Sequence, residues 1–138
     1  MKFDFGPFAA TVPEGWTAGE DGDLIAVYPP DGDSHIQIST YRADADHEPS
    51  ADELWEFSEQ SLEPAWNIDK TSIRRDGTGY TLDAEGPIEE GGGVLAFRLW
   101  PGQLIFATFY HSPDSARHLE AARAFMSSIQ PPRDIRAH

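Results

Sequence analysis

The stretch from Phe3 to Trp16, FDFGPFAATVPEGW, carries the local signals that say most about the fold. Phe8 to Val12 is rich in residues that suit a short strand. Pro13 and Gly15 then supply a tight turn, because proline fixes its own φ and glycine accepts a positive φ. These signals predict an edge hairpin in which the chain returns antiparallel after the turn.

Outward from this stretch, two further strands are expected at Leu24 to Tyr28 and at His35 to Tyr41. In the second, Ile36 and Ile38 alternate with polar residues and should face the core. After a polar connector, Ser50-Ala51-Asp52-Glu53 has the S-x-x-E pattern of a capping box, which predicts a helix to about Leu62.

The next segment carries weaker signals. Lys70 to Arg74 and Thr78 to Glu85 are expected to be strands separated by the turn residues Asp76 and Gly77. Gly86 to Gly93 contains a proline, two glutamates and three consecutive glycines. We expect this segment to be a mobile hairpin loop, since loops of this composition lack side chains to pack.

Val94 to Trp100 and Gln103 to His111 flank Pro101-Gly102, a pair suited to the centre of a type II turn. With a two-residue turn, both faces of this hairpin are apolar. One face carries Leu95, Phe97, Leu99, Leu104 and Phe106, and the other carries Val94, Ala96, Trp100, Ile105, Ala107 and Phe109. Such strands must be covered on both sides.

Arg98 is the charged residue within this apolar hairpin. A buried arginine needs a carboxylate, and Asp83 and Glu85 on the preceding strand are the nearest candidates. The alternative is a guanidinium that reaches the sheet edge.

A final helix should begin at Ser112, with Pro113 at its first position, and should end before Pro131. The expected order is three strands, a helix, four strands and a helix. This order predicts an α/β protein of the α+β type, with a mostly antiparallel sheet of six or seven strands packed by two main helices. We expect one domain over residues 1–130 and a frayed tail over 131–138.

The aromatic opening strand followed by Val-Pro-Glu-Gly-Trp at 12–16, together with the element order, resembles the Mog1/PsbP-like fold family. Members of that family include a protein that binds the Ran GTPase, a photosystem subunit and many bacterial proteins of unassigned role. The resemblance implies a bacterial, non-enzymatic interaction domain. It assigns no functional residue, because no functional motif of the characterised members is matched.

The 138 residues include no cysteine, which excludes disulfides, thiolate zinc sites and a cysteine nucleophile. The N-terminus shows no signal-peptide pattern, and no stretch of 18 apolar residues occurs. We therefore expect a cytoplasmic protein.

The net charge of -14 lies almost entirely in the first half. Residues 1–65 contain 15 acidic residues against Lys2 and Arg42, whereas residues 66–138 contain 9 acidic and 8 basic residues. Such a field disfavours nucleic acid and membrane surfaces and favours a basic protein partner. The simpler alternative is that these acids only keep the protein soluble.

Candidate chemical sites are incomplete. Asp44, Asp46 and Glu48 have calcium-loop spacing, but Pro49 follows where an EF-hand needs glycine. The turn aspartates at positions 21, 23, 31 and 33 are expected to bond neighbouring backbone amides. His111, Asp114 and His118 could converge near a helix end, but without the HExxH spacing we expect no metal or other cofactor.

Trp16 and Trp66 are expected at element ends, partly exposed, while Trp55 and Trp100 are expected in the core. Exposed aromatics beside acids are typical of an interface rim. The candidate partner-binding residues are Glu14, Trp16, Glu20, Asp21, Asp23 and Trp66.

The expected function is therefore a protein-binding module that acts as an adaptor or inhibitor through its acidic N-terminal half. Two alternatives remain. One is an immunity protein that neutralises a basic toxin. The other is a small-ligand-binding protein or hydrolase with a pocket between sheet and helix.

Overall fold

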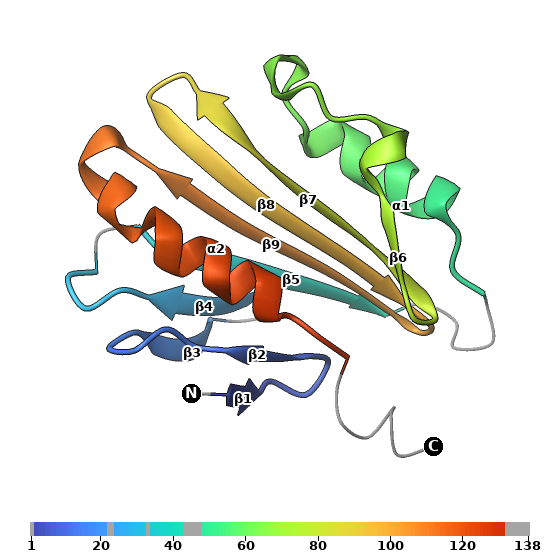
Figure 1. Ribbon diagram of the computed structural model, residues 1–138. Helices are drawn as coiled ribbons and strands as arrows, with labels where there is room; N and C mark the ends of the chain where they lie inside the picture. Colours follow the sequence, from blue (N-terminus) through green and yellow to red (C-terminus); the bar gives the residue numbers. More distant parts are fainter. Residues whose placement is uncertain (1, 22–23, 33, 43–47, 132–138) are drawn as a thin grey trace.

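The computed structural model describes residues 2–21, 24–32, 34–42 and 48–131 (Figure 1). A seven-stranded sheet in the order β3-β4-β5-β9-β8-β7-β6 lies beside a two-stranded ribbon of β1 and β2. The strands are β1 (Lys2–Asp4), β2 (Ala9–Thr11), β3 (Thr17–Asp21), β4 (Leu24–Tyr28), β5 (Ile36–Arg42), β6 (Arg74–Asp76), β7 (Gly79–Ile88), β8 (Gly91–Trp100) and β9 (Gln103–His111). The helices are α1 (Ala51–Ser58) and α2 (Leu119–Ser128), and the 3₁₀ turns are η1 (Glu59–Ser61), η2 (Pro64–Trp66), η3 (Lys70–Ser72) and η4 (Pro113–His118). The expected α+β class with its antiparallel sheet and two main helices is confirmed.

The central hairpin of β8 and β9 forms in the predicted register. Trp100 pairs with Gln103 across the two-residue turn, and Gly102 has a φ of 82°. That positive φ is what the third position of a type II turn requires, so glycine is needed there.

The sheet has a core on each face. On the face packed by α2, the buried residues of β8 and β9 are joined by Phe8, Phe125 and Met126. On the opposite face, Leu95, Phe97 and Leu99 pack with Leu54 of α1. Coverage of this hairpin on both sides, predicted from its apolar residues, is therefore confirmed; Figure 1 shows α2 in front of the sheet.

Arg98 lies on the α2 face and is 4% exposed. Its guanidinium is 2.8 Å from the Asp83 carboxylate and also donates to the carbonyls of Phe97 and Met126 at 2.9 and 3.0 Å. The predicted pairing with Asp83 is confirmed. Because Met126 lies in the last turn of α2, the same side chain also caps the negative end of that helix.

The prediction for the N-terminal hairpin was wrong about the partner strand. β2 pairs with β1, which precedes it, with Phe3 opposite Ala10. The chain after the turn at residues 13–16 instead becomes β3, which pairs with β4 in the main sheet. The expected three strands before the helix are therefore five.

Two expectations for the middle of the chain were also wrong. Lys70–Ser72 forms the turn η3, capped by the Asp69 side chain, and only Arg74–Asp76 is a strand. Residues 86–93 are not an open loop, because Gly86 pairs with Gly93 and Ile88 with Gly91. The glycines allow close packing here: a β-carbon on Gly86 would lie 2.2 Å from the Trp66 ring.

Both helix starts were predicted. The Ser50 side chain accepts from the Glu53 amide at 3.2 Å, and the Ser112 side chain accepts from the Ser115 amide at 3.3 Å. α1 ends at Ser58 and continues as η1, while the last helix begins as η4 and becomes α-helical at Leu119.

Several expectations fall outside the described residues: the tail from 132 to 138, the carboxylates Asp44 and Asp46, and the turn aspartates Asp23 and Asp33. Within the described part of the chain, no helix has the length and apolar character needed to cross a membrane.

Candidate functional site

A groove of about 550 Å³ lies between the β1–β2 ribbon and β3. Its lining is mostly apolar and comes from Phe3, Val12, Pro13, Glu14, Gly15, Trp16, Thr17 and Ala18. We call this feature the Trp16 groove. Phe3 is 47% exposed, which is unusual for a phenylalanine and leaves an aromatic surface available for contact.

The turn at residues 13–16 fixes the position of Trp16 in the lining of this groove. The Trp16 amide donates to the Pro13 carbonyl at 3.1 Å, and Gly15 has a φ of 85°. The turn chemistry predicted from Pro13 and Gly15 is therefore correct, although the turn joins the ribbon to the main sheet.

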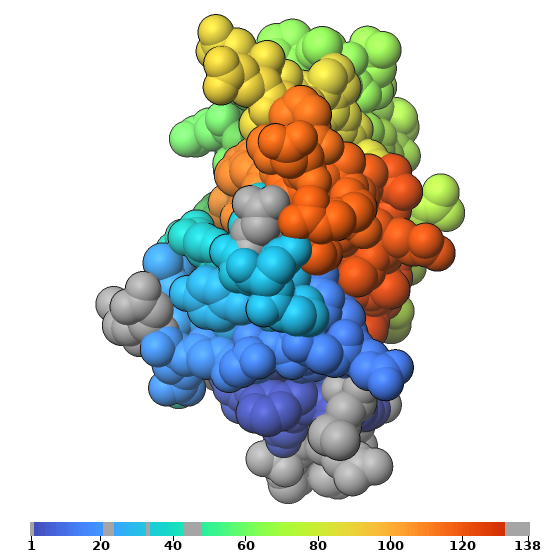
Figure 2. Space-filling model, turned by 90° about the vertical axis from the view of Figure 1, so that its left-hand side faces the viewer, coloured from blue at the N-terminus to red at the C-terminus, as the bar shows by residue number. Residues whose placement is uncertain are grey.

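The inner side of Trp16 is held by η4. The His118 ring meets the indole edge-on with 5.5 Å between ring centroids. His118 Nε2 is in turn 3.0 Å from the Asp31 carboxylate, which also accepts from Arg117 Nη2 at 2.6 Å. In Figure 2 the cyan segment that contains Asp31 lies between the blue N-terminal region and the orange segment of η4.

The side chains of His111 and His118 have different partners in the structure. His118 engages Asp31, whereas the His111 ring bonds the Ser112 carbonyl at 3.1 Å. Among the described residues, no group of three or more histidine and carboxylate side chains is arranged to hold a metal. The contact between His118 and Asp31 carried no sequence signal, because these residues are 87 positions apart.

Only some of the predicted partner-binding residues lie at the groove. Glu14 and Trp16 line it, and both were predicted. Glu20 is exposed on β3 and follows Ala18 on the same face of that strand. The side chain of Asp21 and the whole of Asp23 lie outside the described residues. Phe3 was missed, because the sequence does not show which face of a short strand is covered.

The expectation for Trp66 is corrected. Trp66 is 7% exposed and packs in the core on the α1 side of the sheet. Its Nε1 donates to the Pro87 carbonyl at 2.8 Å, and its ring lies over Gly86. It is therefore a packing residue far along the sheet from β3. Trp100 is buried, and Trp55 is partly buried against the same core as Trp66.

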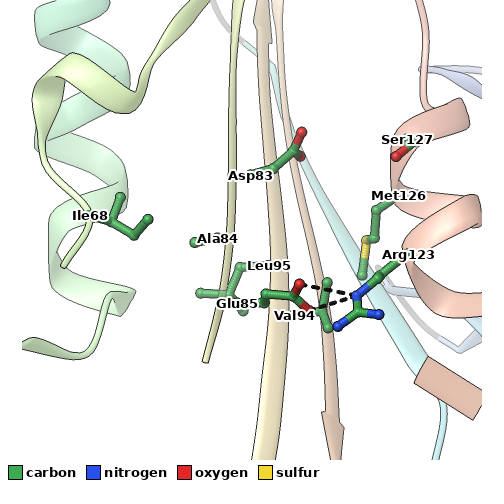
Figure 3. Close-up of a pocket in the computed structure, with 9 residues that line it drawn as sticks. All are labelled: Ile68, Asp83, Ala84, Glu85, Val94, Leu95, Arg123, Met126 and Ser127. Carbon is green, nitrogen blue, oxygen red and sulfur yellow. Dashed lines mark hydrogen bonds and ion pairs between the residues drawn. The ribbon is translucent and has the colours of Figure 1, made fainter. Parts of the chain in front are cut away.

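A second cavity of about 370 Å³ lies between the β7–β8 strands and α2 (Figure 3). Its carboxylates are Asp83 and Glu85. Asp83 pairs with Arg98, and Glu85 accepts from Arg123 at 2.9 and 3.1 Å. Both acids are already bonded to arginine, so the polar groups neutralise one another instead of converging on a substrate.

Comparison with known proteins gives the fold. No protein-family model and no curated protein matches this sequence. The solution structure of cyanobacterial PsbP (CyanoP) from Synechocystis sp. PCC 6803 matches with a TM-score of 0.62 and 12% identity, covering 95% of this chain and 91% of that one. The fold is PsbP-like.

A crystal structure of a protein from Bacteroides thetaiotaomicron VPI-5482 also matches this chain, with a TM-score of 0.55 and 14% identity. The match covers 93% of this chain and 46% of that chain, so this protein spans less than half of that relative. At these identities the likeness carries the fold and assigns no function. The predicted resemblance to the PsbP-like fold is thereby confirmed.

Proposed function

We propose that this PsbP-like protein is a non-enzymatic, cytoplasmic protein-binding module whose contact surface is the Trp16 groove. The partner we propose carries a basic segment. A small acidic inhibitor that neutralises a basic toxin is one form of this function.

The observation that carries the proposal is the apolar groove with acids on its rim. Phe3 and Trp16 offer aromatic surface, and aromatic residues dominate the energetics of protein interfaces. Glu14 lies in the groove and Glu20 is exposed on the adjoining strand. Apolar contact supplies affinity, while acids at the rim steer a basic partner and raise its association rate.

The competing proposal of a ligand-binding or hydrolytic pocket between sheet and helix gains less support. The cavity at α2 occupies the expected place, but its carboxylates Asp83 and Glu85 are bonded to Arg98 and Arg123. A general acid or base needs a carboxylate that can exchange protons with a substrate.

The test compares capture of proteins from a native lysate of the source organism by three immobilised forms of the chain. The wild type and the control variant Glu56→Lys/Glu59→Lys should retain a shared set of basic proteins. The variant Glu14→Lys/Glu20→Lys should lose that set. The control changes two exposed acids at α1, so it matches the change in net charge.

Retention of the same proteins by all three forms would show that the acids near the groove only confer solubility. For a retained partner, the association rate should fall as salt rises, because exposed charges are screened over about 8 Å at physiological ionic strength.

A further inference from the structure

The two edges of the main sheet are protected differently. At the β7 edge, β6 pairs with Gly79–Thr81. Farther along β7, the Trp66 indole bonds the Pro87 carbonyl, and Pro87 has no amide hydrogen to offer. Main-chain groups at both ends of this edge are therefore occupied or absent, a protection against unwanted strand pairing, whereas residues 82–86 between them pair with no described strand on that side.

The outer edge of β3 has neither a described partner strand nor a proline. β3 is the terminal strand of the sheet, and no described strand pairs with its outer side. The β1–β2 ribbon pairs with itself and, through Ala9, with Gln130. In an antiparallel ladder alternate residues direct their main-chain groups to opposite edges, so part of β3 presents free donors and acceptors.

Side chains beside this edge match a particular kind of added strand. Ala18 lines the Trp16 groove, and Glu20 is two residues farther along the same face. Glu14, on the turn that precedes Trp16, also lines the groove. Gly19, between Ala18 and Glu20, has no atom within 4 Å of a β-carbon built on it, so the other face of β3 is unobstructed there.

We infer that β3 accepts an extended segment of the partner as an additional strand of the sheet. This inference rests on the proposed function and specifies how the same surface binds its basic partner. The segment has the pattern basic–x–apolar–x–basic. Its apolar side chain enters the Trp16 groove beside Ala18, and its two cations face Glu20 and Glu14.

Main-chain hydrogen bonds supply affinity in strand addition, and side-chain pockets along one face supply specificity. The acids also disfavour pairing of β3 with β3 of a second copy. Glu20 would approach the acids of an identical strand, and like charges placed across strands are destabilising. The same charge that repels a copy attracts a basic segment.

The probe is a blocked synthetic peptide, Thr-Lys-Thr-Leu-Thr-Lys-Thr, titrated into isotope-labelled full-length protein. There are two control peptides. The first carries N-methyl groups on both lysines and the leucine, and the second carries N-methyl groups on the two threonines that flank the leucine. Each set of amides lies on one edge of an extended peptide, and only one edge can bond to β3. The parent peptide should shift and protect amides of residues 17–21.

One methylated peptide should bind at least about tenfold more weakly, which is what loss of one or two main-chain hydrogen bonds produces. The other should bind as the parent does. Equal binding by all three peptides would overturn strand addition, and so would the absence of saturable binding by the parent.

The outcome also separates this inference from the proposed function. If all three peptides bind equally and Glu14→Lys/Glu20→Lys abolishes that binding, the acidic groove remains a binding surface without strand addition. If the charge variant binds the parent peptide as tightly as the wild type, the assigned contacts of Glu14 and Glu20 are wrong.

Discussion

The two faces of the main sheet are covered to different extents. On the α2 face, α2 and the β1–β2 ribbon cover one continuous core, which extends from Ile25 on β4 to Val94 on β8. On the opposite face, α1 and the turns after it cover the β7–β8 half. Three tyrosines of that face, Tyr28, Tyr41 and Tyr110, are 38–49% exposed and lie on β4, β5 and β9.

The difference follows the side-chain pattern of each strand. β8 is apolar at nearly every position and is buried between the two layers. β5 alternates, so Ile36 and Ile38 are buried while Gln37 is exposed on the other face. A strand with one apolar face needs one covering layer, and a strand with two needs two. The extent of each helical layer is thus matched to the strands beneath it.

The largest expected effect tests whether both faces are true cores. Phe97→Ala on the α1 face and Phe109→Ala on the α2 face should each lower the free energy of unfolding by about 3–5 kcal/mol, since both rings are fully buried. Urea denaturation measures both. If Phe97→Ala lowers the free energy of unfolding by less than about 1 kcal/mol while Phe109→Ala gives the full loss, the α1 layer contributes little to stability.

Within the α1 face, two glycines contrast the covered half with the open half. Gly86→Ala should cost about 1–3 kcal/mol, because the new methyl group would overlap the Trp66 ring. Gly19→Ala, with open space around it, should be neutral or stabilise by about 0.5 kcal/mol. Denaturation of both variants gives the comparison, and equal effects would contradict the assigned packing of Trp66.

On the α2 face, loss of the buried charge of Arg98 should lower the stability more than loss of the exposed ion pair between Glu85 and Arg123. Arg98→Met removes the partner of Asp83 and of the Met126 carbonyl, at a cost of about 2 kcal/mol. Glu85→Gln breaks the half-exposed pair with Arg123 and should cost less than about 1 kcal/mol. An unchanged melting temperature for Arg98→Met would remove any stabilising role for the pairing.

The smallest effect concerns Tyr110 at the border of the covered half. Desolvation, and after it the charge of Glu63, raise the pKa of this phenol above its ordinary value of 10.0. The raised pKa means that the folded state holds the proton more tightly. The resulting stabilisation is complete below about pH 10 and is lost as pH rises through the folded-state pKa.

Glu63→Gln should therefore lower the pKa of Tyr110 towards the ordinary value. Phenolate absorbance, corrected with Tyr110→Phe, measures the titration of this single group. Identical titration curves for the wild type and Glu63→Gln would show that desolvation alone raises the pKa.

The parts of the fold that were predictable are those encoded by neighbouring residues. The central hairpin, its turn at Gly102 and the caps at Ser50 and Ser112 all depend on short-range patterns. The pairing of Arg98 with Asp83 was also accessible, because strands joined by a hairpin are adjacent in the sheet.

The parts that were missed depend on contacts between distant segments. Glycines at 86 and 91–93 are typical of a loop by composition, yet Gly86 and Gly93 accommodate an indole that comes from η2, and Gly91 and Gly92 lie against His111. β2 pairs with a strand before it instead of the one after its turn. At the candidate site, Glu14 and Trp16 were proposed because an aromatic residue beside acids is typical of an interface rim, whereas Phe3 and the support of Trp16 by His118 needed three-dimensional information.

The edge-on contact between Trp16 and His118 also gives the groove an optical signal. The surroundings of an indole set its emission, and the His118 imidazole is part of the surroundings of Trp16. The same indole lines the groove, and an occupant that excludes water shifts its emission to shorter wavelength. Because Trp55, Trp66 and Trp100 do not line the groove, a shift of emission on binding comes from Trp16 and gives a label-free reading of occupancy in the unmodified protein.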